Sequence, residues 1–397
     1  MKGLTQKIFL LILFFGLISL FGDLIYESAR SINGQYLLLL GATASIIGFF
    51  IGLGEFLSNF LRFVFGFLAD RIKNYWLFIF IGYFFLIFVP LMFFANSWQI
   101  AILFIIFERI GKAIRNPARD TIVSIISERT KSIGFNFGII EFLDQIGALI
   151  GPIIIAIFFL LYVENVIDKY KIVYLFLFIP FLVLIFLLLV TYLKTKNLKI
   201  NIKKLKDKNI PKIFWYYNLF IFLTSLGFIH FAILGYHFKL KNIAEDHFIV
   251  FLYSIAMIFD AIISPIIGKI YDKIKEKKKS FFDLFFIIPI LSISIPFLVF
   301  INKIETIVLS MIFYGFVLGI QETIMRAAIA DIISISKRGS AYGIFSFVLG
   351  ISAFFGSTII GILYEISILY LFIFIIISQV LALMMLIAIR NRFKNYF

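Results

Sequence analysis

The stretch GFLADRIK at 66–73, which lies between two long apolar runs, decides the fold of this chain. A related stretch, GKIYDKIK at 268–275, returns about half a chain later, again between apolar runs. In both copies a glycine lies four residues before an aspartate, which a basic residue follows. This repetition predicts a duplicated membrane domain, and membrane proteins built from related halves usually move solutes through a site between the halves.

The composition indicates a membrane protein. Hydrophobic residues make up 62% of the 397 residues, and 54 residues are phenylalanine. An ordinary globular domain is ~45–50% apolar, so a soluble fold of this length could not bury so much apolar surface. The apolar runs are continuous, which favours helices over a transmembrane barrel. We therefore expect an all-α integral membrane protein.

The apolar runs are long enough for twelve membrane-spanning helices, since a hydrocarbon core of about 30 Å needs about 20 helical residues. We predict spans at 7–39, 44–68, 76–94, 98–124, 134–161, 172–193, 213–238, 247–267, 281–301, 305–331, 340–363 and 367–390. The first span is long, and we expect it to bend near Asn33 and Gly34.

Lysine and arginine concentrate in alternate loops, which accounts for the net charge of +15 without a nucleic-acid partner. By the positive-inside rule these loops are cytoplasmic, so both termini are predicted to be cytoplasmic. The lysine-rich segment 194–212 lies at the midpoint. We expect it to link two six-helix bundles, 1–193 and 213–397; contact with lipid headgroups is the alternative role.

Glycines repeat in the later spans of both halves. GFNFG at 134–138 corresponds to GSAYG at 339–343, and Gly151 corresponds to Gly356. Small residues at such spacing let two helix backbones approach closely in lipid. We therefore expect these glycines to pack helices together.

These motifs resemble the major facilitator superfamily. Its signature loop after the second span is G-x-L-A-D-R-x-G-R-[KR], which 66–71 resembles, although Lys73 and Asn74 depart from it. GALIGP at 147–152 is similar to the G-x-x-x-G-P motif of the antiporter branch. The resemblance implies two pseudo-symmetric six-helix bundles. It also implies hinge or packing residues Gly147, Gly151 and Pro152, and cytoplasmic gate residues Gly66, Asp70, Arg71, Arg119, Asp120 and Asp272.

A narrower resemblance covers spans four and ten. GKAIRNPARD at 111–120 is similar to a group of prokaryotic permeases with G-K-x-x-R-x-P-x-R-D in span four. QETIMRA at 321–327 is similar to the Q-E-x-x-x-R-A element in span ten of the same group. This resemblance is specific for the fold and does not identify a substrate.

Charged residues inside the predicted spans form stripes at helical spacing. Asp23, Glu27 and Arg30 share one helix face. Each charge would cost ~2.5–3.5 kcal/mol at mid-bilayer, so we expect them to face a hydrated cavity or one another. The candidate substrate and ion-coupling residues of a central cavity are Asp23, Glu27, Arg30, Glu55, Asn59, Arg62, Glu108, Arg109, Lys112, Glu141, Asp144, Glu322 and Arg326.

Two roles for these stripes stay open. Structural ion pairs are favoured for residues near cytoplasmic ends, namely Arg115, Arg119, Asp120 and Asp331. Coupling in a cavity is favoured for Asp23, Glu27, Glu55 and Glu141. A carboxyl group removed from water can exchange protons near neutral pH, as a proton-coupled carrier requires. Because most of the acids lie in the first half, we place ion coupling there.

Other side chains in the spans carry weaker signals. His230 and His237 share a face of span seven, but no carboxylate partner lies in register, so we expect no metal site. Tyr26, Tyr236 and Tyr253 could line a pocket, although packing is the simpler role for each.

Several function classes are excluded or disfavoured. The chain has no cysteine, which excludes disulfides and thiolate metal sites. It has no Walker A motif and no nucleophile elbow, so we expect no cofactor and no enzymatic activity.

The sequence favours a secondary active transporter that moves a small solute across the cytoplasmic membrane by alternating access. We expect proton-coupled efflux by antiport. The alternatives are a proton-coupled uptake symporter and a non-transporting membrane sensor on the same fold. The expected partners are a small-molecule substrate, H⁺ and the lipid bilayer, with no nucleic acid, and we expect a monomer.

Overall fold

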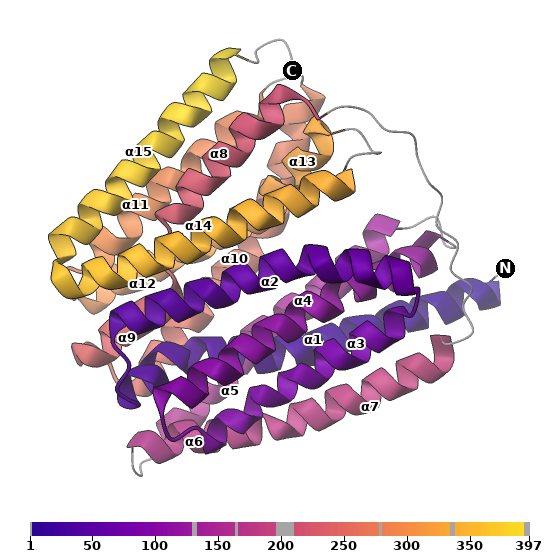
Figure 1. The fold of residues 1–397 in the computed structure, drawn as a ribbon, viewed down its shortest axis with the longest axis horizontal. Coiled ribbons are helices and arrows are strands. Elements are labelled where there is room, and N and C mark those ends of the chain that lie inside the picture. The colour runs from indigo at the N-terminus through magenta and orange to yellow at the C-terminus, as the bar shows by residue number, and fades with distance from the viewer. Residues whose placement is uncertain are drawn as a thin grey trace. The chain divides into compact units, whose positions relative to one another are not determined.

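The protein is all-helical over the residues described by a computed structural model, namely 2–128, 133–162, 166–195, 210–277, 280–333 and 338–392. Figure 1 shows the helices α1 (Lys2–Leu39), α2 (Ala44–Ile72), α3 (Tyr75–Phe84), α4 (Trp98–Glu128), α5 (Ile133–Leu161), α6 (Val166–Phe176), α7 (Phe178–Thr195), α8 (Lys212–Leu226), α9 (Phe231–Leu240), α10 (Asp246–Glu276), α11 (Ile287–Val299), α12 (Ile304–Ile320), α13 (Arg326–Ile332), α14 (Arg338–Ile366) and α15 (Ile368–Arg392). Shorter 3₁₀ turns are η1 (Phe85–Phe88), η2 (Pro90–Phe94) and η3 (Phe281–Phe286), and η4 (Gln321–Met325) is a π-helical turn.

The prediction of an all-α membrane fold is confirmed. Within the described ranges, 11 helical stretches are long and apolar enough to cross a membrane. The predicted span that is absent from this set is α4, which carries the charged residues from Glu108 to Asp120.

Five predicted spans are not single regular helices. Span six divides between α6 and α7, and span nine begins with the 3₁₀ turn η3 before α11. Span three changes from α3 to the turns η1 and η2, where Pro90 begins η2 and cannot donate to the preceding turn. Span seven is interrupted at 227–230, between α8 and α9. Span ten contains the π-turn η4, so its residues do not keep α-helical spacing. By contrast, α1 runs through Asn33 and Gly34 as one uninterrupted helix.

The chain forms two compact units. Unit 1 comprises Met1–Ala42, Leu57–Lys203 and Asp246–Phe251, and unit 2 comprises Thr43–Phe56, Lys204–Glu245 and Leu252–Phe397. The boundaries fall inside α2 and α10, so each of these helices contributes to both units. Most of the predicted linker, residues 196–209, lies outside the described residues.

Unit 1 is organised around close packing of α1 against α5. At Gly151 a Cβ atom would lie 2.6 Å from the Leu24 carbonyl oxygen, a distance that real Cβ atoms do not show. Only glycine therefore lets the two backbones approach this closely. α3 packs on α4, and α7 packs on α1. α4 also contacts α1 directly.

Unit 2 repeats this packing with its own helices. α8 packs against α14 and α15, and α15 also lies beside α11 (Figure 1). A Cβ atom at Gly356 of α14 would collide with the Leu226 carbonyl of α8, as at Gly151 in unit 1. The corresponding glycines of the two halves thus make the same kind of contact.

The two motif copies also pack alike, each inside its own unit. A Cβ atom at Gly66 would lie 3.5 Å from the Pro117 side chain of α4. One at Gly268 would lie 3.5 Å from the Thr323 side chain of η4. Spans four and ten occupy corresponding places in the repeat, as expected for a duplicated fold.

Candidate functional site

Polar and charged side chains of α1, α4 and α5 meet inside unit 1. Glu108 and Arg109 of α4 are each only 3% exposed, and Glu27 of α1 is 7% exposed. Burial of charges is costly unless they are paired. Arg30 pairs with Glu27 at 3.4 Å, and Arg109 Nε lies 3.7 Å from Glu108 Oε2.

Tyr26 of α1 lies at the centre of this group. Its hydroxyl accepts a hydrogen bond from Arg109, whose guanidinium carbon lies 4.7 Å from the centre of the Tyr26 ring. Lys112 Nζ lies 3.9 Å from the same centre, and the Arg30 guanidinium lies at 5.9 Å. Cations favour the negative face of an aromatic ring. Cationic side chains from α1 and α4 therefore lie around the Tyr26 ring.

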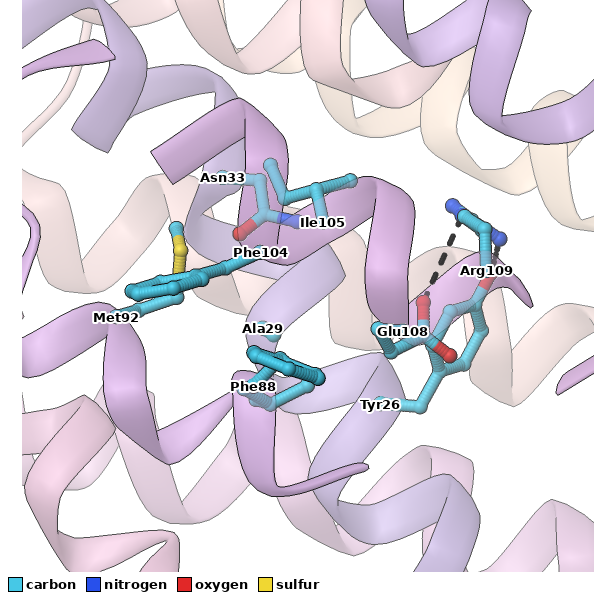
Figure 2. Close-up of a pocket in the computed structure, with 10 residues that line it drawn as sticks. Tyr26, Ala29, Asn33, Phe88, Met92, Phe104, Ile105, Glu108 and Arg109 are labelled. Carbon is cyan, nitrogen blue, oxygen red and sulfur yellow. Dashed lines mark hydrogen bonds and ion pairs between the residues drawn. The ribbon is translucent and has the colours of Figure 1, made fainter. Parts of the chain in front are cut away.

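A small cavity of about 10 Å³ adjoins the group, which is room for one water molecule. Figure 2 shows Tyr26, Glu108 and Arg109 together at one end of it. The remainder of the lining is mainly apolar and comes from α1, α4 and the turns η1 and η2; it comprises Ala29, Asn33, Phe88, Val89, Met92, Phe104 and Ile105.

Acidic groups from α1 and α5 share the cations of α4. Asp23 interacts electrostatically with Lys112, Arg115 and Arg119. Asp144 of α5 interacts with Asp23 and also with Lys112 and Arg119. The close packing of α1 on α5 is what brings these two carboxyl groups to the same pair of cations. A proton added to either carboxyl group would therefore change the electrostatic interactions of both groups with these cations.

The basic residues of α4 contact two neighbouring helices. Arg119 donates to Ser19 of α1 at 2.6 Å and pairs with Asp120 at 3.0 Å. Arg115 instead lies 5.0 Å from the Tyr83 ring of α3 and donates to the Gly82 carbonyl at 3.5 Å. Arg115 thus joins α4 to α3.

The candidate residues that the structure brings together in unit 1 are Asp23, Glu27, Arg30, Glu108, Arg109, Lys112, Arg119, Glu141 and Asp144. Glu141 is exposed, unlike its neighbours in this group. Tyr26 carries only a weak signal in the sequence, although it is adjacent to Glu27 in the charged first span. Ser19 has no role in the sequence analysis, and Asn33 appears there only as the place of an expected bend.

The remaining candidates lie elsewhere. Glu55 belongs to unit 2, whereas Asn59 and Arg62 belong to unit 1. Arg71, Asp120, Asp272, Glu322 and Arg326 are exposed, and the Asp70 side chain lies outside the described residues. Gly147 and Pro152 lie with Gly151 in α5, and Gly147 abuts the Leu20 carbonyl of α1.

His230 has a carboxylate neighbour from another helix, which the spacing along span seven did not indicate. His230 Nε2 lies 3.7 Å from Glu55 Oε1, because the interruption of span seven turns the His230 side chain toward α2. A regular helix through 227–230, as the sequence predicted, would have presented a different face. Among the described residues, no cluster of three or more histidines and acids could hold a metal ion.

Removing the Tyr26 hydroxyl tests its place in this group. Tyr26→Phe keeps the ring and loses the bond from Arg109, so we expect the free energy of unfolding to fall by about 1–2 kcal/mol. Thermal unfolding of the purified protein in detergent measures this. Tyr370→Phe, at an exposed tyrosine of α15, is the control and should have no effect. Equal stability of Tyr26→Phe and the wild type would contradict the assigned hydrogen bond.

Comparisons with known proteins agree with this architecture. The family model described as Major Facilitator Superfamily matches residues 8–320. An uncharacterized protein of Mycobacterium tuberculosis is 34% identical over 386 residues, which cover 95% of this chain and 92% of that protein. An uncharacterized MFS-type transporter of Methanocaldococcus jannaschii is 28% identical over 376 residues, covering 92% and 90%.

Solved structures show the same fold at low sequence identity. A point mutant of the nucleoside transporter NupG has a TM-score of 0.71 and 16% identity, covering 96% of this chain and 100% of that one. A POT family transporter in complex with a thioalcohol conjugated peptide has a TM-score of 0.71 and 14% identity, covering 97% and 96%.

Proposed function

Because this chain belongs to the major facilitator superfamily, and is thus a multi-pass membrane transporter and not an enzyme, we propose that it exports a small solute in exchange for protons. The observation that carries the proposal is the buried charge network of unit 1. It joins carboxyl groups of α1 and α5 to cations of α4. In this proposal, the gate residues of the 66–73 motif alternate between two contacts as the transporter opens to each side.

The network is suited to proton exchange because its acids share their cationic partners. If one of these carboxylates takes up a proton, the cation that it faced keeps the remaining carboxylates as partners. Protonation would thus change the attraction between α1 and α4 without leaving a lone buried charge, which would cost several kcal/mol. A carrier needs this property, since its ion site must be stable in both protonation states.

A cationic or amphipathic solute fits antiport through this network. Such a solute would compete with the proton for the same carboxylates, so that binding of one favours release of the other. The GALIGP motif at 147–152, similar to that of the antiporter branch, also favours exchange over symport.

We further propose a location in the cytoplasmic membrane, with both termini on the cytoplasmic side. The basic loops support this orientation. The lysine-rich segment 194–212 would then be the cytoplasmic connector between the two halves.

The proposal is tested by transport in proteoliposomes with an imposed pH gradient. Ligands found by thermal-shift screening of a metabolite and drug library serve as substrates. We expect solute and protons to move in opposite directions. Movement in the same direction would replace antiport with symport, and solute flux that no proton movement accompanies would refute the coupling. Single-turnover counterflow separates a transporter from a sensor, since a sensor binds without exchanging.

Neutralising Glu27 should separate coupling from binding. Glu27→Gln is expected to reduce gradient-driven flux to the level of empty liposomes while leaving solute counterflow measurable, because exchange needs no net proton movement. Asp168→Asn changes an exposed acid of α6 and should behave as the wild type. Unchanged gradient-driven flux in Glu27→Gln would assign this carboxylate to structure.

A further inference from the structure

Span seven of unit 2 is a discontinuous helix. α8 ends at Leu226 and α9 begins at Phe231, in the middle of a stretch apolar enough to cross the membrane. Such a break releases backbone groups that lipid cannot satisfy. Discontinuous helices of this kind frequently carry ion or substrate sites in transporters.

Side chains from other helices satisfy the groups at the break. Gln379 of α15 donates to the Thr224 carbonyl at 2.8 Å and accepts from the Thr224 hydroxyl at 3.0 Å. The Tyr314 hydroxyl of α12 accepts from the Phe231 amide at 3.1 Å. Gln379 and Tyr314 are both fully buried. Hydrogen bonds from buried side chains of α12 and α15 therefore stabilise the break.

His230 caps the N-terminus of α9 and has a defined tautomer. Its Nδ1 accepts a hydrogen bond from the Ala232 amide at 3.2 Å, so the proton of the neutral ring lies on Nε2. Nε2 faces Glu55 Oε1 of α2 at 3.7 Å. A second ring proton would have to lie on Nδ1, where it would oppose the Ala232 amide. Protonation of His230 would thus remove the hydrogen bond that caps the first turn of α9.

We propose that His230 and Glu55 form a proton-exchange pair at the break in span seven. The pair takes up one proton on the imidazole and releases it without any other chemical change. With the carboxylate ionised and the imidazole neutral, its net charge is −1, and with one proton added it is zero. This inference rests on the proposed proton coupling for its role in transport.

The surroundings of the pair suit this role. The side-chain exposures of Glu55 and His230 are 20% and 11%, so helix packing does not fully enclose the pair. The titratable groups that face the break include Glu55 from α2 and Tyr314 from α12, and α15 contributes the neutral Gln379. Glu55 lies next to the position where α2 passes from unit 2 to unit 1. Protonation of the pair would therefore change the electrostatic attraction between His230 and α2 at that position.

The test is nuclear magnetic resonance of the purified full chain labelled with ¹⁵N-histidine. The His230 signals are assigned by their loss in His230→Asn, since asparagine keeps an N-cap acceptor for α9 but cannot bind the proton. We expect these signals to change with one midpoint between about pH 5 and 9. In Glu55→Gln the midpoint should move to lower pH by about one unit, because the facing negative charge is lost.

Glu305→Gln is the matched control, an exposed acid of α12 in the same unit, and should leave the midpoint unchanged. Signals that do not change over this pH range, or equal midpoints in the wild type and Glu55→Gln, would overturn the proposal. The measurement needs no substrate, so it is independent of the export proposal. If the His230 signals titrate as expected but no proton flux accompanies solute transport, only the export proposal is refuted. If transport is proton-linked but the His230 signals do not titrate, only the present inference is refuted.

Discussion

Replacing Arg109 with methionine is expected to abolish transport and to lower the free energy of unfolding by about 3–5 kcal/mol. Arg109 is 3% exposed, and it contacts both Glu108 and the Tyr26 hydroxyl. Removing the cation leaves the Glu108 carboxylate in a buried site beside a hydroxyl that has lost its donor. Unfolding in detergent measures the stability, and counterflow in proteoliposomes measures the transport.

A double variant separates function from structure at this pair. Glu108→Gln with Arg109→Met removes both charges, so most of the lost stability should return. We expect transport to remain absent, because Arg109 also holds Tyr26 in the network. If stability and transport both return, the pair is a structural ion pair and not part of the transport site.

An exposed pair provides the control for these variants. Arg390 lies 3.3 Å from Asp283, and both side chains are about half exposed. Arg390→Met should change the stability by less than about 1 kcal/mol. If Arg390→Met lowers the free energy of unfolding as much as Arg109→Met does, burial of the ion pair does not determine how much its loss destabilises the protein.

Adding one methyl group at Gly151 is expected to destabilise the protein by about 1–3 kcal/mol. In Gly151→Ala the new Cβ would lie 2.6 Å from the Leu24 carbonyl oxygen, so α1 and α5 must move apart. That movement would also separate Asp23 from Asp144, so transport should fall together with the melting temperature. Thermal unfolding and counterflow measure the two effects.

Gly138 offers a matched control on the same helix. A Cβ atom there would meet no atom within 4 Å, so Gly138→Ala should stabilise α5 by about 0.5–1 kcal/mol through helix propensity. Equal effects of the two substitutions would show that the close approach of α1 and α5 does not limit the stability.

The candidate site was predictable in part. Helical spacing placed Asp23, Glu27 and Arg30 on one face of α1, and the glycines of 147–152 indicated a helix in close contact. The pairing of that face with Arg109 and Lys112 was not predictable, since spacing fixes positions around one helix axis and not the neighbour that each face meets. Arg115 illustrates this, because it lies three residues after Lys112 on α4 but contacts Tyr83 of α3.

By itself the sequence determined the membrane class, the helical fold, the family and the duplication, because hydrophobicity, loop charge and motif spacing are local properties of the chain. Only the tertiary structure decided that Tyr26 gathers the cations and that span seven breaks at 227–230, where His230 faces Glu55. The physical reason is that lipid satisfies no backbone group. A break inside the membrane is stable only where distant residues such as Gln379 and Tyr314 supply the missing partners.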